Sequence, residues 1–351
     1  MICSACSFDL IHSPNQYSPN SASVRQLQAT KQCPGCDLEG ANLSDVNLQQ
    51  ANLQGADLTG ANLSRANLSE ANLTQADLRQ ANLKGINLHR AKLTGAQLSW
   101  TGKNLLNLGN STRANLRGAN LSGANLITAY LRGADLRGAD LRGAYLHAAD
   151  LNEAILNKAN LSEADLFGLK VSGADLSGAN LKRVNLMAAS LAKVNLSEVN
   201  LQGANLHGVD IQGANLSGAN LSGANLSAAI LVGSNLEDAN LKGAKLKRAS
   251  LAKVNLSEVN LQEADLQGAD LSGTNLTQVN LSGADLRQAY LTKADLSQAK
   301  LDKAILNGAK LRGANLGGAD LKGAVGLNKP LISLEPVQPL TSKSPLTKHN
   351  H

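Results

Sequence analysis

Leucine returns at every fifth position along most of the chain, with a small apolar residue two positions before it and polar residues elsewhere. The first run extends from Leu38 to Leu98, and a second run in a shifted frame extends from Leu116 to Leu321. This period does not fit an α-helix, because five steps of about 100° rotate each successive leucine by about 140° and spread the apolar residues around the surface. It does not fit a continuous strand either, because an odd period sends successive leucines to opposite faces.

The five-residue period is satisfied when three extended residues are followed by two residues at a corner. In each repeat, written Ala-(Asn/Asp)-Leu-x-x, Ala and Leu then point inward. The Asn or Asp between them and the two corner residues point outward. Glycine often takes the last position, where a type II turn needs a positive φ that glycine adopts without steric cost. The pattern therefore predicts an all-β coil that changes direction at each repeat.

The number of repeats per coil can be inferred from the outward position between Ala and Leu. Rows of this position taken every twenty residues from Asn115 and Asn120 are mostly asparagine, whereas one row holds none. That row consists of Tyr130, Asp150, Lys170, Ser190, Asp210, Ile230, Ser250, Asp270, Tyr290 and Lys310. Because twenty residues are four repeats, we predict a coil with four sides.

Repeats such as ANLSGANLSGANL at 214–226 resemble those of the pentapeptide-repeat family, and the resemblance covers about residues 36–323. It implies a right-handed quadrilateral β-helix, a fold common among cyanobacterial proteins. It implies little about activity, because the repeated residues are structural.

The repeats also divide the chain into segments. Ser111, Thr112 and Arg113 are extra residues between the two runs, and we predict that they form a bulged corner. Both ends need caps, because an open β-helix exposes unpaired backbone edges, and we expect a short helix over the first coil. The predicted segments are a disordered start at 1–20, an N-terminal cap at 21–35, a first run of repeats at 36–110, a bulge at 111–113, a second run at 114–323, and a cap with a disordered tail at 324–351.

Four cysteines form two C-x-x-C pairs, Cys3 with Cys6 and Cys33 with Cys36. Four thiolates at this spacing could bind zinc, and a redox switch is a second alternative. Cys33 and Cys36 take the inward Leu and Ala positions, however, which favours thiols that fill the core. We expect no cofactor. Paired C-x-x-C spacings suit a reducing compartment, and the N-terminus lacks the basic start and apolar stretch of a secretory signal, so we expect a cytoplasmic protein.

Composition agrees with a rod of many small layers, because aromatic residues make up only 2% of the chain and leave Leu, Ala and Val to fill the interior. The net charge of +6 is modest, and basic residues are dispersed except in one belt at corner positions. The belt consists of Arg113, Arg117, Arg132, Arg137 and Arg142. It could hold phosphate or an acidic partner, but it lacks aromatic platforms for single strands and a helix for a major groove. A solvated charged surface is the favoured interpretation.

Other candidate catalytic groups do not converge. His147 and His207 share one corner row but lie three coils apart, about 14 Å at the strand spacing, which is too far for one metal. Asp135 and Asp140 lie on adjacent sides and diverge, whereas acid–base catalysis needs groups that converge. A convex rod also offers no pocket of the usual kind. The sequence therefore predicts that the protein is not an enzyme.

The favoured hypothesis is a noncatalytic scaffold that presents a ladder-like face to a protein partner. The row without asparagine is the best candidate, because Tyr130, Ile230 and Tyr290 break an otherwise polar coat, beside Lys170 and Lys310. Nucleic-acid binding through the arginine belt is one alternative. Another is mimicry of DNA against a topoisomerase, which the resemblance to resistance members of the family implies, but that mechanism needs an acidic rod. No membrane partner is expected.

Overall fold

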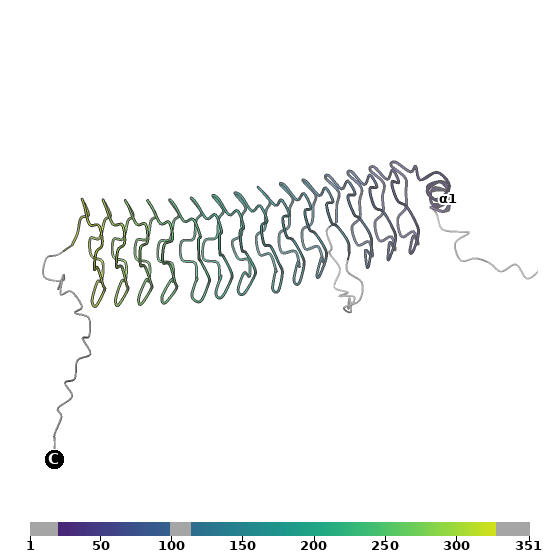
Figure 1. The fold of residues 1–351 in the computed structure, drawn as a ribbon. Helices are drawn as coiled ribbons and strands as arrows, with labels where there is room; N and C mark the ends of the chain where they lie inside the picture. Colours follow the sequence, from purple (N-terminus) through teal and green to yellow (C-terminus); the bar gives the residue numbers. More distant parts are fainter. Residues whose placement is uncertain (1–19, 99–113, 328–351) are drawn as a thin grey trace, which may run out of the picture.

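The computed structural model describes residues 20–98 and 114–327, which form one elongated solenoid (Figure 1). Residues 1–19 of the segment predicted to be disordered at 1–20, the predicted bulge at 111–113 and the tail beyond 327 lie outside the described residues, whereas Asn20 is described as the N-cap of a helix. Within these two ranges the chain repeats one unit, in which a single bridging residue is followed two positions later by a turn. The protein is therefore built from very short strands and many corners.

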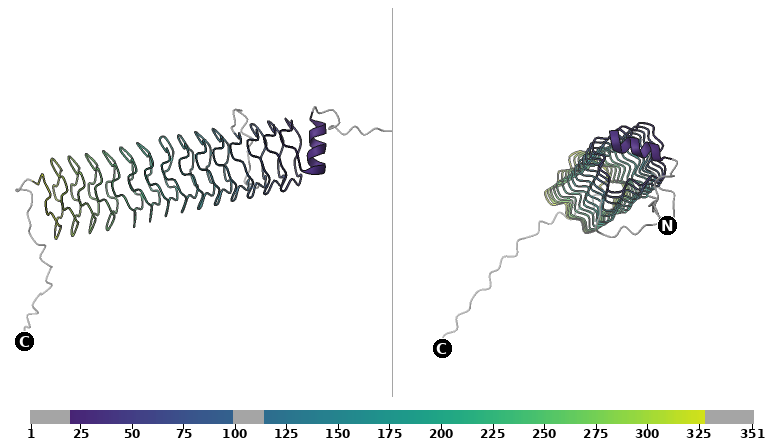
Figure 2. Two further views of the ribbon diagram at one scale, coloured as in Figure 1. Left: turned by 90° about the horizontal axis from the view of Figure 1, so that it is seen from above. Right: turned by 90° about the vertical axis from the view of Figure 1, so that its right-hand side faces the viewer.

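One helix precedes the solenoid: α1 spans Ser21–Thr30 and lies across the N-terminal end of the rod (Figure 2). Its C-cap is Lys31, which has a left-handed backbone (φ 55°) and whose N–H donates to the Leu27 carbonyl. Leu27 is fully buried and is the one buried residue of α1. The helix therefore contributes Leu27 to the end of the core, and the partly buried Val24 packs against it.

Neighbouring coils are joined by parallel bridges between residues twenty positions apart, such as Asn160 with Asn180 and Asn180 with Asn200. At most bridges the outward residue both donates and accepts. The Asn180 N–H donates to the Ala159 carbonyl at 2.9 Å, and the Asn180 carbonyl accepts from the Leu161 N–H at 2.8 Å. One coil therefore contains four five-residue repeats, and parallel bridging connects each coil to the next along all four sides.

Every repeat ends in a tight corner. At one such corner the Ala164 N–H donates to the Leu161 carbonyl at 3.0 Å, and the Glu163 N–H donates to the next coil at the Lys182 carbonyl at 2.9 Å. The last corner residue has a positive φ, as a type II turn requires. Glycine fills many of these positions, but a similar number hold a non-glycine residue with φ between 54° and 63°.

The core consists of stacked columns of Leu and Ala, nearly all of them fully buried. Valine replaces alanine at several inward positions, such as Val184 and Val199. Two inward hydroxyls also occur. Ser234 donates to the Leu231 carbonyl at 2.6 Å, and Thr274 donates to the Leu251 carbonyl at 3.0 Å, so neither leaves an unpaired polar group in the core.

The twenty-residue register changes once. Asn115 bridges Asn87, and Asn125 bridges Gln97, so the spacing there is 28 residues. A three-residue insertion, as predicted from Ser111 to Arg113, would have paired Asn115 with Lys92. The prediction was wrong because an insertion of eight residues shifts a five-residue frame by the same amount as an insertion of three.

Candidate interaction surfaces

The row without asparagine forms a continuous ladder of bridges from Tyr130 to Lys310, here called the Tyr130 ladder. Ile230 is 38% exposed and Tyr290 is 51% exposed, whereas Tyr130 is half-buried. Lys170 and Lys310 are exposed on the same ladder. Ile230 lies five coils from Tyr130 and three from Tyr290, about 24 Å and 14 Å at the strand spacing. The three apolar side chains therefore do not form one patch.

Asparagine rows have a structural explanation that sequence reasoning missed. The Asn180 amide donates to the Asn160 side-chain oxygen at 3.0 Å, and the Asn200 amide donates to the Asn180 oxygen at 3.2 Å. The Asn180 oxygen also accepts the N–H of Lys182 at the corner, at 3.2 Å. Asparagine thus supplies both an amide ladder and a turn contact. A row without asparagine lacks these side-chain amide hydrogen bonds, so its side chains are determined by other constraints.

A second ladder lies at the corner that precedes the side of the Tyr130 ladder; it is the corner row that His147 and His207 share, and its apolar members were not predicted from the sequence. Its side chains stack in successive coils, and the rings of His147 and Phe167 are stacked with their centroids 4.8 Å apart. Ile127 is 38% exposed, His147 and His207 are exposed, and Phe167 and Met187 are half-buried. We call it the apolar corner ladder; it consists of Ile127, His147, Phe167, Met187 and His207.

The second residue of the same corner is small in each of these coils. These positions hold Thr128, Ala148, Gly168, Ala188, Gly208 and Ala228. Neither corner position carries Asp, Glu, Lys or Arg between 127 and 228, whereas the other three corners carry charges over the same coils, such as Lys158, Lys182 and Lys193. Tyr145, 54% exposed, lies two residues before His147. Between residues 127 and 228 the rod therefore has one corner that is free of Asp, Glu, Lys and Arg and rich in large apolar side chains, whereas the same corner carries Lys247, Arg248 and Arg287 in later coils.

The arginine belt, which the sequence predicts to be a solvated charged surface, is largely neutralised by its own neighbours. Arg137 pairs with Asp135 at 2.5 Å, and Arg142 pairs with Asp140 at 2.7 Å. These hydrogen bonds hold the pKa of both carboxyls below its usual range. The remaining members differ: Arg132 pairs with Glu153 at 2.5 Å, Arg117 forms no ion pair with a described residue, and Arg113 lies outside the described residues.

The pairs follow from the local sequence Asp-Leu-Arg. Asp and Arg flank the inward Leu, so both side chains point outward and lie beside each other. The same sequence produces the pairs of Asp77 with Arg79 and of Asp285 with Arg287, each at 2.5 Å. Applied to the sequence, this rule identifies Arg137 and Arg142 as members of ion pairs, but it does not predict the pairing of Arg132 with Glu153 in the next coil.

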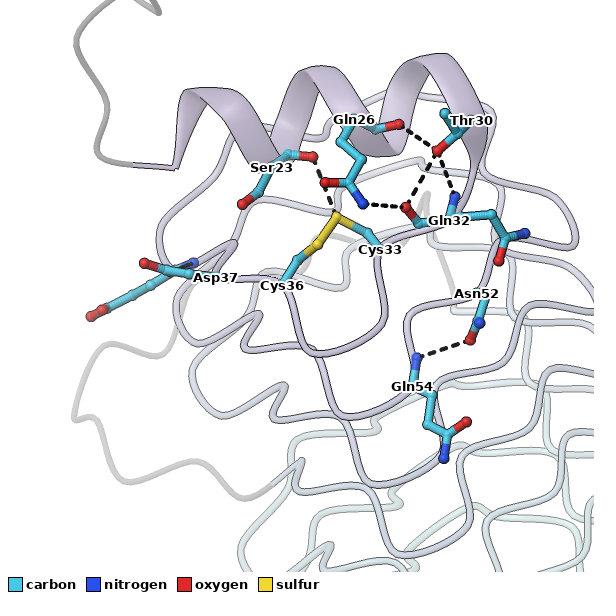
Figure 3. The surroundings of a disulfide bond; sticks show 10 residues. Ser23, Gln26, Thr30, Gln32, Cys33, Cys36, Asp37, Asn52 and Gln54 are labelled. Carbon is cyan, nitrogen blue, oxygen red and sulfur yellow. Dashed lines mark hydrogen bonds between the residues drawn. A yellow bond between two sulfur atoms is a disulfide. The ribbon is translucent and has the colours of Figure 1, made fainter.

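Cys33 and Cys36 form a disulfide beneath α1 (Figure 3), so the expectation of free buried thiols was wrong. The inward Leu and Ala positions of one corner are adjacent, which brings the two sulfurs together. Cysteines in a disulfide cannot act as thiolate ligands of zinc. Cys3 and Cys6 lie outside the described residues. Within 20–98 and 114–327, no group of three or more His, Cys, Asp or Glu side chains could hold a metal ion.

The repeat model of the family described as pentapeptide repeats matches the sequence in eight copies. The matched residues are 36–75, 71–101, 112–147, 144–183, 179–218, 219–257, 255–292 and 289–325. The chain belongs to the pentapeptide-repeat family. This confirms the resemblance seen in the sequence and identifies the all-β solenoid as a fold shared by the family. No curated relative matches the sequence.

Several solved pentapeptide-repeat proteins are similar to this one. HetL, involved in heterocyst differentiation regulation in the cyanobacterium Nostoc sp. strain PCC 7120, is 31% identical; the match covers 86% of this chain and 94% of HetL, with a TM-score of 0.18. Rfr23 from the cyanobacterium Cyanothece 51142 is 33% identical over 37% of this chain and 86% of its own, with a TM-score of 0.21. A trypsin-treated variant of QnrB1, a plasmid-mediated fluoroquinolone resistance protein, is 22% identical over 53% and 88%, with a TM-score of 0.30. All three TM-scores are low, so family membership rests on the repeats.

The pentapeptide repeat accounts for the inward Leu and Ala, the outward Asn and the corner Gly of this protein. It does not account for the apolar corner ladder or for the Tyr130 ladder. Helix α1 is too short and too polar to cross a membrane, and it is the one helix among the described residues. The candidate functional surfaces of this pentapeptide-repeat protein are therefore the places where the sequence departs from the repeat without a structural reason.

Proposed function

We propose that this pentapeptide-repeat protein is a noncatalytic scaffold that binds a protein partner through the apolar corner ladder and the adjoining Tyr130 ladder. The observation that carries the proposal is the concentration of large apolar side chains at one corner. The whole sequence contains two Phe and two Met, and one of each, Phe167 and Met187, occupies neighbouring coils there. Interfaces between proteins are enriched in Phe, Tyr and Met and depleted of Lys, Glu and Asp at their centres.

The fold does not need these side chains. The same corner position elsewhere is filled by Ser, Gln, Lys or Asp, as at Ser162, Gln202 and Asp302, and those corners close with the same backbone bonds. Phe and Met at a solvated corner leave apolar surface in contact with water, and covering that surface is favourable. A partner with an uncharged apolar centre is the occupant that this chemistry favours.

Nucleic acid is a weaker candidate partner. Three belt arginines are already paired with carboxylates, so a phosphate would have to compete with Asp135, Asp140 and Glu153. Non-specific nucleic-acid binding depends on cations that are free to displace counterions. Mimicry of DNA remains unsupported by charge, because the chain carries a net charge of +6.

The test is co-purification from the native host with full-length protein as bait, using wild type and a Phe167→Ser/Met187→Ser variant. Serine occupies equivalent corners elsewhere, so this variant is expected to keep the fold. The matched control is Lys182→Ser/Gln202→Ser, which changes two stacked corner residues on another edge of the same region. We expect the control to retain the partner that the apolar variant loses. Retention of every partner by the apolar variant, with unchanged circular dichroism, would exclude this surface.

The contribution of the Tyr130 ladder is tested separately with Ile230→Ser and Tyr290→Ser. If the two ladders form one interface, the affinity for the partner falls in these variants as well as in the corner variant. If only the corner variant loses affinity, the interface is confined to the apolar corner ladder. Titration of the identified partner by isothermal calorimetry measures both effects.

A further inference from the structure

The Cys33–Cys36 disulfide joins two residues that the solenoid already holds together. The Cys36 N–H donates to the Cys33 carbonyl at 3.3 Å, and the next corner closes by the same bond alone, with the Ala41 N–H donating to the Leu38 carbonyl at 3.0 Å. A cross-link over four residues also removes less freedom from the unfolded chain than one that closes a long loop. Because its structural contribution is small, we propose that Cys33–Cys36 is a thiol–disulfide exchange site that is reduced by a dithiol and coupled to α1.

The two sulfurs differ in solvent exposure, which determines which of them an incoming thiolate attacks. Cys33 is fully buried, whereas Cys36 is partly exposed at the end of the rod. A thiolate of the incoming dithiol attacks the Cys36 sulfur, the bond between the two cysteines breaks, and the Cys33 sulfur leaves and takes up a proton. The second thiol of the dithiol then attacks the mixed disulfide and releases Cys36 as a thiol. Two electrons and two protons pass to the protein, and the dithiol becomes a disulfide.

Helix α1 contacts the site directly. The Cys33 sulfur lies 3.4 Å from the carbonyl oxygen of Ser23 in the first half of the helix (Figure 3). The far half of α1 is held to the first coil by polar contacts, in which the Gln26 amide donates to the Gln32 carbonyl at 2.9 Å and the Lys31 ammonium donates to the Gln49 carbonyl at 3.3 Å. At the near end the amide of Asn20, the N-cap, donates to the Glu39 carbonyl at 2.5 Å, so a change at Cys33 acts on the part of the helix that lies between these polar contacts.

The two oxidation states differ in what lies beneath α1. A disulfide sulfur carries no hydrogen, so in the oxidised protein Cys33 touches the Ser23 carbonyl without donating to it. Reduction supplies an S–H donor, but thiols are weak donors. Reduction also replaces one covalent bond by two thiols that must separate, in a site where Cys33 and Leu27 are both fully buried. Crowding of a packed site is costly, so it outweighs the weak new hydrogen bond and loosens the helix.

The experiment uses full-length protein carrying Cys3→Ser and Cys6→Ser, equilibrated with mixtures of reduced and oxidised dithiothreitol. Rapid alkylation and mass spectrometry count the free thiols, and hydrogen exchange of residues 20–33 follows the helix. We expect Cys33 and Cys36 to become alkylated together, in one two-electron transition. We also expect the α1 amides to exchange several-fold faster in the reduced protein, with the central coils unchanged.

The control variant is Cys33→Leu/Cys36→Ala, which restores the residues that the repeat places at these positions. Its α1 exchange is expected to be slow and independent of the dithiol. A pair that resists reduction until the solenoid is denatured would overturn the exchange site. Reduction without any change at α1 would overturn the coupling, and native protein isolated with one zinc on four cysteine thiolates would overturn both.

Discussion

One corner ladder alternates between glycine and alanine, and this alternation allows the energetic requirement of a corner to be measured. Gly168, Ala188, Gly208 and Ala228 occupy equivalent positions in four successive coils, and all have positive φ, with 60° at Ala188 and 57° at Ala228. Alanine pays a steric penalty in this conformation that glycine avoids. We therefore predict that Ala188→Gly/Ala228→Gly stabilises the solenoid and that Gly208→Ala destabilises it.

The magnitude follows from two opposing contributions. A left-handed conformation costs an L-residue roughly 1–2 kcal/mol. Glycine loses more backbone freedom on folding, which costs about 0.5–1 kcal/mol relative to alanine. The net gain is about 0.5–1 kcal/mol for each substitution, and the two sites lie about 10 Å apart, so their effects should add. A Cβ at Gly208 meets nothing within 4 Å, so its penalty is conformational and not a clash.

The assay is equilibrium unfolding in urea, followed by circular dichroism. The double variant is expected to raise the midpoint without a change in slope, and Gly208→Ala is expected to lower it. Ala204→Gly is the control, because Ala204 is fully buried and lacks a positive φ, so glycine there loses both a core methyl and backbone freedom. A double variant that is neutral or less stable than wild type would refute the claim that alanine corners are strained.

Three further predictions test the core, the asparagine ladder and the ion pairs. Leu206→Ala removes a fully buried side chain and should cost about 2–5 kcal/mol, measured by urea unfolding. Asn200→Asp keeps the turn acceptor but loses the amide that donates to Asn180, so its thermal midpoint should lie between wild type and Asn200→Ala, which loses both. Arg137 lowers the pKa of Asp135 in the folded protein. Between the folded and unfolded pKa values of this carboxyl, the unfolded state therefore binds more protons than the folded state. The pair's contribution is present above the unfolded pKa of about 4 and is lost below the folded pKa, so Arg137→Gln should weaken the protein near neutral pH and leave it unchanged in strong acid.

Local rules that repeat in every coil could be predicted from the sequence. The five-residue spacing of leucine places Leu and Ala inward, and these are the buried residues. Glycine in the last position matches the positive φ observed there. The rows with asparagine and the row without it all repeat every twenty residues, and the observed bridges join residues twenty positions apart. Each inference succeeds because dozens of copies of one local rule reinforce one another.

Features that occur once are harder to infer. The insertion before Ala114 leaves a frame shift of three residues whether it contains three residues or eight, so the sequence alone does not fix its size. The disulfide of Cys33 with Cys36 requires knowledge that the inward positions of one corner are adjacent. Non-glycine corners such as Glu198 (φ 56°) carry no sequence signal, because stacking against neighbouring coils imposes the left-handed conformation.

The functional surface belongs to a third category, since it consists of departures from the repeat. Ser234 and Thr274 also depart from it, but each donates a hydrogen bond to a core carbonyl, so packing explains them. Phe167 and Met187 have no such explanation, because their corner closes with the same backbone bonds as corners that hold serine. The folding requirements of this solenoid repeat every five residues, and they do not specify the side chain at this corner position. Selection for binding can therefore act most directly on large apolar side chains that stack there. That argument separates the apolar corner ladder from Ile230 and Tyr290, which are exposed but bridge polar residues in the coils on both sides.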